Sequence, residues 1–220
     1  MANKYTSELN ERIELFKKSF ISNDGTCTIN EQTSVSMVVY YNLFDNIEPL
    51  KLQLKHLVEE KNFHHNCGMV GLRRLFIALN KCGLEEYAYK IITAKGFPSF
   101  LAWKEAGATT LLEKWQMDES QNHQMYSDFM SWIIKTLVGI NLSANSLAYQ
   151  KVDIKPIFID ELKYCHGYTE TPYGKITVSW KRHDNKISLK VTIPEGVVAC
   201  CKYVDGGVLK TGENNIEVLL

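Results

Sequence analysis

Apolar positions in the first two-thirds of the chain recur at the spacing of helices that bury one face. The first stripe contains Leu9, Ile13, Phe16 and Phe20, and it ends at the turn-forming run Asn23-Asp24-Gly25. The same periodicity predicts further helices, joined by short loops, which should pack as antiparallel hairpins. One of these helices should begin after Asn30 and another near Pro49. Two more should cover residues 72–79 and 84–92, and the last should run roughly from Gln124 to Leu137.

After residues 142–145 the period of the apolar positions changes to two. Residues 176–180 alternate between apolar and polar, and so do residues 187–193, with Asp184-Asn185 between them. Two alternating runs around a turn predict a β-hairpin with one buried face. Further short strands are expected at residues 152–158, 162–168, 197–203 and 216–219.

The order of these elements predicts the domain organisation. A length of 220 residues suits one large or two small domains with a core of useful size. Helices followed by strands favour two layered domains over a doubly wound sheet. We therefore expect a helical domain at residues 1–146 and a small antiparallel β-sandwich at residues 147–220.

Charge and composition narrow the function classes. Lys and Arg total 25, and Asp and Glu total 25, so the formal net charge is zero and no basic excess favours nucleic acid as a partner. No apolar run reaches the length of a membrane span, which argues against an integral membrane protein. The amino end, residues 1–8, lacks the apolar core of a signal peptide and predicts a cytoplasmic location.

The cysteines and a histidine pair favour structural roles over metal binding. The six cysteines show no CxxC spacing, so we expect reduced thiols that serve as small buried hydrophobes. Cys200 and Cys201 are adjacent on an expected strand and should point to opposite faces. His64 and His65 stand beside Cys67 without a second ligand cluster, so no metal is expected.

Glu113 has the most informative surroundings in the chain. It follows a loop of small residues, lies between Trp103 and Trp115, and precedes His123 by ten positions. Aromatic rings stack on sugar rings and a neighbouring acid can activate water, so this pattern is typical of a sugar-cleaving site.

The same residues also allow structural interpretations. Thr110 and Glu113 have the spacing of a capping box, which from sequence physics alone outranks catalysis. A histidine at position 123 would by itself more often begin a helix or lie in a core than bind a ligand. Trp103 and Trp115 fit either a core or a sugar platform.

Together, these segments resemble the carboxyl-terminal half of bacterial α-L-rhamnosidases, which are inverting glycoside hydrolases with a six-hairpin α/α barrel. The similarity spans almost the whole chain, and the segment at residues 107–115 is its most specific part. The other matching motifs are Gln32-Thr33-Ser34, residues 64–71, Gly83 with residues 87–89, Phe97-Pro98-Ser99, Asn122-His123 with Trp132 and Gly139-Ile140, Ile154-Lys155-Pro156, residues 171–176, Trp180-Lys181-Arg182 and residues 191–194.

The resemblance implies a fold and an activity. The fold would be part of a six-hairpin α/α toroid followed by a small antiparallel β-sandwich. The activity would be hydrolysis of terminal α-L-rhamnosides in rhamnose-containing glycosides with inversion, without metal or organic cofactor.

The resemblance also implies residue roles. Glu113 takes the place of the general base that deprotonates the attacking water, His123 that of a histidine contacting the bound sugar, and Trp115 that of a ring lining the site. Trp103 is an aromatic displaced from the family's usual position and a further candidate for sugar contact. Leu111-Leu112 depart from the family, which has tryptophan directly before the acid.

The family's general acid belongs to an acid-rich motif upstream of the segments found here. An inverting site needs two carboxyls about 6.5–9.5 Å apart, and Glu8, Glu11 and Glu14, on the polar side of the first helix, offer no substitute. The helical part supplies about half of a full barrel. We therefore expect little or no activity from the chain alone.

Half a toroid should also leave an apolar edge, which predicts self-association or docking to a separate amino-terminal half. Two alternatives to an enzyme remain open. One is a non-catalytic carbohydrate-binding remnant that holds a sugar through Trp115 and His123. The other is an incompletely predicted gene product with no independent function.

Overall fold

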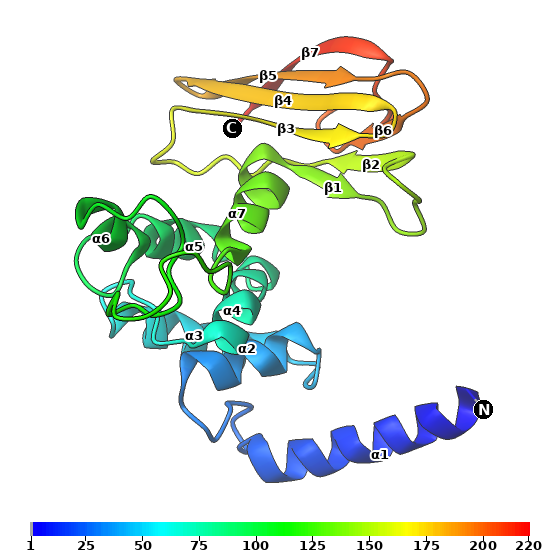
Figure 1. Cartoon of the computed structure of the whole chain (residues 1–220). Coiled ribbons are helices and arrows are strands. Elements are labelled where there is room, and N and C mark those ends of the chain that lie inside the picture. Colours follow the sequence, from blue (N-terminus) through cyan, green and yellow to red (C-terminus); the bar gives the residue numbers. More distant parts are fainter. Residues whose placement is uncertain (1) are drawn as a thin grey trace. The chain divides into compact units, whose positions relative to one another are not determined.

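The computed structural model describes residues 2–220, which form two compact units, one ending at Phe129 and the other beginning at Met130 (Figure 1). The boundary expected at residues 146–147 stays a prediction. The helices of the first unit are α1 (Ala2–Phe20), α2 (Gln32–Tyr40), α3 (Ile47–Glu59), α4 (Met69–Lys81), α5 (Glu85–Ile92) and α6 (Phe100–Glu105), and α7 (Asp128–Trp132) crosses into the second unit.

The core of the helical unit is formed by α2, α3, α4 and α5. Pro49 lies in the first turn of α3 as expected, where its missing N–H costs no helical hydrogen bond. The apolar stripes predicted for these helices are buried, and their largest members are Leu50, Leu54, Leu72, Leu75, Phe76, Leu79 and Ile91.

Gln32 fixes the start of α2 within this core. Its side chain is fully buried, and its amide nitrogen donates to the carbonyl oxygens of Leu57 and His64, both at 3.1 Å. The side-chain oxygen Oε1 of Gln32 accepts a hydrogen bond from the backbone N–H of Asn66 at 3.0 Å. A single buried amide therefore positions the connection that leads into α4.

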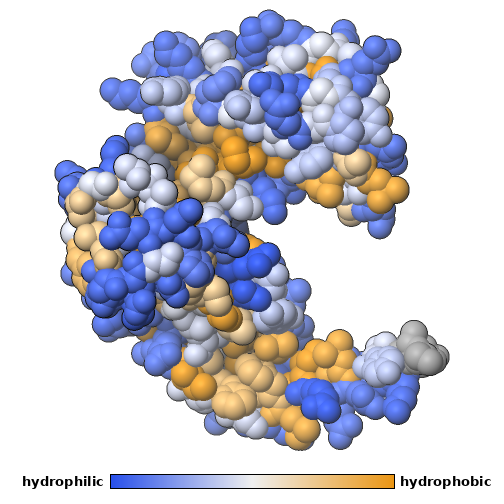
Figure 2. All heavy atoms as spheres, in the orientation of Figure 1, coloured by the Kyte–Doolittle hydropathy of each residue, from blue (hydrophilic) through white to orange (hydrophobic). Residues whose placement is uncertain are grey.

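The expected apolar stripe of α1 exists but is not buried. Leu9 is 56% exposed, Phe20 is 39% exposed, and Ile13 and Phe16 are only half-buried. Hydrophobic side chains accordingly show at the surface along this helix in Figure 2. The periodicity correctly predicted a helix with an apolar face, and the residues that the structure describes leave that face largely uncovered.

Two details of the predicted helices are wrong. Thr110 and Glu113 do not form a capping box, because no helix begins there: the Glu113 N–H donates to Ser120 O and the Thr110 hydroxyl donates to Gln121 O. The helix expected from Gln124 begins only at Asp128, and after Trp132 it continues as a π-helix, η1 (Ile133–Val138).

The second unit contains two sheets. In the smaller sheet, β2 (Lys151–Ile154) lies between β1 (Ile140–Leu142), which is antiparallel to it, and β6 (Val198–Cys201), which is parallel to it. The larger sheet is antiparallel throughout and has the order β3 (Tyr164–Thr171), β4 (Gly174–His183), β5 (Lys186–Ile193) and β7 (Gly212–Leu219). The hairpin predicted around Asp184-Asn185 is confirmed, since β4 and β5 pair directly across it.

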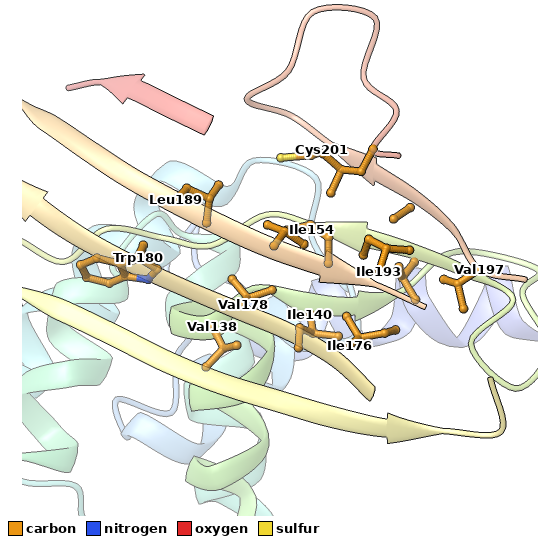
Figure 3. Close-up of a cluster of buried hydrophobic side chains, with 14 of the residues drawn as sticks. Val138, Ile140, Ile154, Ile176, Val178, Trp180, Leu189, Ile193, Val197 and Cys201 are labelled. Atoms are coloured by element: carbon orange, nitrogen blue, oxygen red, sulfur yellow. The ribbon is translucent and has the colours of Figure 1, made fainter. Parts of the chain in front are cut away.

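Both sheets and η1 contribute to the core of the second unit (Figure 3). Trp180 anchors it: the ring is 2% exposed and its indole N–H donates to Leu137 O at 2.8 Å. Gly139 ends η1 with a φ of 83°, and a side chain there would place Cβ 2.1 Å from the Pro156 nitrogen. Cys201 points into this core while Cys200 is exposed, as the strand pattern predicted.

A helical part followed by largely antiparallel sheets confirms the predicted fold class. Within residues 2–220, none of the helices combines the length and the apolar character needed to cross a membrane.

Candidate active site

The segment between Leu111 and His123 is a loop closed by hydrogen bonds between its two arms. The His123 N–H donates to Leu111 O at 2.8 Å, and the Glu113 N–H donates to Ser120 O at 2.9 Å. The Thr110 hydroxyl adds a further bond to Gln121 O. Residues ten positions apart in the sequence are thereby held opposite each other. We call residues 111–123 the base loop.

Glu113 and His123 meet across the base loop. The Glu113 carboxylate oxygen Oε2 lies 3.5 Å from His123 Nδ1, and the two side chains are 35% and 38% exposed. Water therefore reaches both groups, while each restricts the other's orientation. A carboxylate that lies beside an imidazole and is accessible to water has an arrangement suited to a general base.

The ring of Trp115 packs within a cluster of aromatic side chains. It stacks on Trp103 with centroids 4.1 Å apart and planes inclined by 18°, and it contacts Tyr126 at 4.7 Å. Trp103 is 3% exposed, and its indole N–H donates to Trp115 O at 3.1 Å. Trp103 therefore holds the base loop against α6 in this structure. Contact of either ring with a sugar stays a prediction.

His65 is a member of this cluster that the sequence did not assign to the site. Its ring lies 4.5 Å from that of Trp115 and is 3% exposed. Burial lowers the pKa of His65 to about 4, so the imidazole is neutral near pH 7. The neutral His65 ring therefore packs against the ring of Trp115. The residues that it contacts are remote in sequence, so no local motif indicated this role.

A groove of 470 Å³ adjoins His123. Arg73 and Asp128 form an ion pair in its wall, with Nε 3.4 Å from Oδ1. This volume gives a ligand room beside one member of the Glu113–His123 pair. The remaining lining residues are Met69, Val70, Arg74, Gln124, Met125 and Ser127.

Two other carboxylates close to these elements are paired with cations, whereas Asp118 is exposed in the base loop. Glu119, in the base loop, accepts a hydrogen bond from Lys114 Nζ at 2.8 Å. Asp128 is held by Arg73. Glu113 combines water access with a histidine neighbour at 3.5 Å.

Two family profiles cover most of the chain. The bacterial alpha-L-rhamnosidase 6 hairpin glycosidase domain matches residues 1–137, and the bacterial alpha-L-rhamnosidase C-terminal domain matches residues 139–206. The chain belongs to the bacterial α-L-rhamnosidase family. The resemblance derived from the sequence motifs is therefore confirmed.

Curated α-L-rhamnosidases share this similarity over most of the chain. One from Formosa agariphila is 29% identical over 194 residues, which is 82% of this chain and 20% of that relative. One from an Alteromonas species is 23% identical and covers 90% of this chain and 23% of the relative. The chain thus spans about a fifth of the length of the curated α-L-rhamnosidases that it matches.

Solved α-L-rhamnosidase structures share the fold. The Streptomyces avermitilis enzyme complexed with L-rhamnose superposes with a TM-score of 0.84 at 21% identity, over 100% of this chain and 24% of that one. The Aspergillus terreus enzyme gives a TM-score of 0.88 at 22% identity, over 99% of this chain and 27% of that one.

Proposed function

We propose that these 220 residues supply the general-base side of an inverting α-L-rhamnosidase site. Glu113 is the base, and His123 orients it and contacts the sugar. The observation that supports this proposal is the Oε2–Nδ1 distance of 3.5 Å between two water-accessible side chains, within the region that the six-hairpin profile matches.

The proposed reaction uses each group once. The Glu113 carboxylate takes a proton from a water molecule as the water oxygen attacks the anomeric carbon of a terminal rhamnosyl unit. The bond from that carbon to the leaving oxygen breaks, and a second carboxyl group protonates this oxygen. Attack on the face opposite the leaving group inverts the configuration.

A separate polypeptide provides the second carboxyl in this proposal. An inverting site needs an acid that can release a proton, about 6.5–9.5 Å from the base. Glu119 and Asp128 are both held by cations, and we do not assign the role to Asp118, which is exposed in the base loop. The chain alone should therefore hydrolyse rhamnosides weakly or not at all.

The exposed stripe of α1 supports docking to such a polypeptide. Leu9 and Phe20 are 56% and 39% exposed on one helix face, and monomeric proteins rarely leave large contiguous apolar patches uncovered. A second copy of the chain would cover the stripe in the same way. Light scattering and apolar-dye binding of the purified chain test both docking and self-association. A monodisperse monomer that binds no apolar dye would contradict both.

The groove beside His123 favours one alternative, a non-catalytic protein that binds carbohydrate. Its 470 Å³ leave room for a sugar whether or not an acid is supplied. Calorimetry with L-rhamnose detects such binding. Binding without turnover under every condition would favour this alternative.

The cytoplasmic location expected from the amino end stays a prediction.

The decisive experiment is reconstitution. The chain is mixed with a separately produced, acid-bearing amino-terminal part of an α-L-rhamnosidase, and the anomer first released from an α-L-rhamnoside is identified by proton NMR. The proposal predicts activity in the mixture and release of the inverted anomer. Glu113→Gln should abolish this turnover and leave rhamnose binding intact. Full activity of the Glu113→Gln mixture would exclude Glu113 as the base.

A further inference from the structure

The outer face of the four-stranded sheet carries two exposed aromatic rings. The inward side chains of β4, Ile176, Val178 and Trp180, are at most 2% exposed, so the opposite face of the sheet is the one that meets solvent. On that outer face Tyr164 is 71% exposed and Tyr168 is 49% exposed. Both belong to β3, the edge strand in the sheet order.

The two rings flank a row of polar groups. Tyr164 and Tyr168 are four residues apart on one strand, which places their Cα atoms about 13 Å from each other on the same face. His166 lies between them and pairs with Ser179 of β4, while Tyr168 pairs with Thr177. An imidazole and two hydroxyl groups thus lie beside and between the rings, where they can exchange hydrogen bonds with a ligand.

Tyr168 is held in place before any ligand arrives. The Lys175 ammonium lies 4.1 Å from the centroid of its ring, and Glu170 binds the same ammonium at 3.1 Å. A cation over one ring face stabilises the ring's position. A ring that is already ordered loses less conformational freedom on binding.

The charges of this face nearly balance: three of its lysines are paired with glutamates, and Lys181, opposite Tyr164, adds one further positive charge. A face with so small a net charge attracts polyanions such as nucleic acids weakly. The outward positions of β4 and β5 carry Ser, Thr, Lys and one His, and they lack the apolar centre of a protein interface. The compensating ion pairs are Lys175–Glu170 at 3.1 Å, Lys186–Glu217 at 2.7 Å and Lys190–Glu213 at 2.6 Å.

We propose that this face binds a neutral oligosaccharide through Tyr164 and Tyr168. Sugar rings present apolar C–H groups on their faces and hydroxyl groups around their edges, which complements two aromatic rings with polar side chains between them. The distance between the rings requires a ligand longer than one sugar unit. This site lies in the second unit and does not use Glu113.

Calorimetry with two neutral probes, an α-linked L-rhamnose trisaccharide and cellotriose, tests the proposal on the full 220-residue chain. Binding of either trisaccharide, weakened about tenfold by the double change Tyr164→Ala and Tyr168→Ala, is the expected result. Tyr168→Phe should retain binding because it keeps the ring. Tyr5→Ala, which removes another exposed tyrosine, should also retain it.

Three results would overturn the proposal. One is no binding of either trisaccharide by the folded chain. Another is binding that the double variant leaves unchanged, with its folding verified by circular dichroism. The third is a double variant whose only change is in oligomeric state by light scattering, which would show that β3 is a contact between copies of the chain. Loss of turnover in the reconstituted enzyme bears on Glu113 and not on this face.

Discussion

The indole nitrogen of Trp103 donates a hydrogen bond to the carbonyl oxygen of Trp115, two positions after Glu113, at 3.1 Å. The two indole rings also stack with centroids 4.1 Å apart. The proposed base is therefore positioned from behind by α6, through an aromatic pair that need not contact the substrate. Trp103 is a positioning residue in this account.

Trp103→Phe tests that role. Phenylalanine cannot make the hydrogen bond to Trp115 O and fills less of the space, so we expect a loss of about 1–3 kcal/mol in the free energy of unfolding. In the reconstituted enzyme kcat should fall more than KM rises. Urea unfolding and steady-state kinetics measure the two effects. Lys104→Ala, an exposed change on α6, is the control and should leave both unchanged.

Glu113→Ala tests the chemical role of the carboxylate. Removing a general base should lower kcat of the reconstituted enzyme by about 10²–10⁴-fold. Azide is an anionic nucleophile that needs no deprotonation, so it should restore turnover and yield a rhamnosyl azide of inverted configuration. Glu119→Ala, in the same loop, should retain turnover and show no azide effect. Wild-type turnover by Glu113→Ala without azide would refute the assignment.

The buried His65 predicts a pH-dependent stability. Its folded-state pKa of about 4 lies below the ordinary value of 6.5, so between these values the unfolded chain binds more protons than the folded one. The contribution of neutral His65 to the free energy of unfolding is therefore fully present above pH 6.5. It is lost as the pH drops towards 4, and the total loss is on the order of 3 kcal/mol.

Urea unfolding followed by tryptophan fluorescence at several pH values measures this dependence. His65→Leu should flatten the curve between pH 6.5 and 4, whereas His56→Leu, which changes an exposed histidine on α3, should not. An unchanged slope in His65→Leu would show that other groups cause the acid sensitivity.

Gly71 predicts a steric effect opposite to ordinary helix propensity. In an open helix, glycine to alanine stabilises by about 1 kcal/mol. A Cβ at Gly71 would lie 2.1 Å from Thr33 Oγ1 and 2.9 Å from Thr33 Cβ, so Gly71→Ala should instead cost about 1–3 kcal/mol.

Thermal unfolding separates the two expectations. Gly68→Ala is a matched control at the start of the same helix, because it has negative φ and no atom within 4 Å of the added Cβ; it should change stability by less than about 1 kcal/mol. Thr33→Ala should partly rescue Gly71→Ala. A stabilising Gly71→Ala would contradict the close approach of α2 and α4.

Much of the fold was predictable from local patterns. Helical spacing located α2 to α5, and the alternation on both sides of Asp184-Asn185 fixed the β4–β5 hairpin. These signals suffice because each element buries one regular face. The parallel pairing of β2 with β6 joins strands that are remote in sequence, and no local period contains that information.

The sequence identified the key residue of the base loop, Glu113, and did not predict the loop's backbone conformation. The motif at residues 107–115 singled out Glu113, but the same letters also fit a capping box. The structure differs because Ser120 and Gln121, later in the chain, accept the hydrogen bonds of Glu113 and Thr110. His65 lies in the connection before α4 and Arg73 lies within α4, and only tertiary packing could place them in this region.

The rate of 4-nitrophenol release from 4-nitrophenyl α-L-rhamnoside, by the chain alone and with an acid-bearing amino-terminal part, tests the central claim most directly. We predict a rate at background for the chain alone and a rise in the mixture that depends on Glu113. Rapid release by the unaided chain would contradict the view that its proton acceptor needs a carboxyl group from another polypeptide.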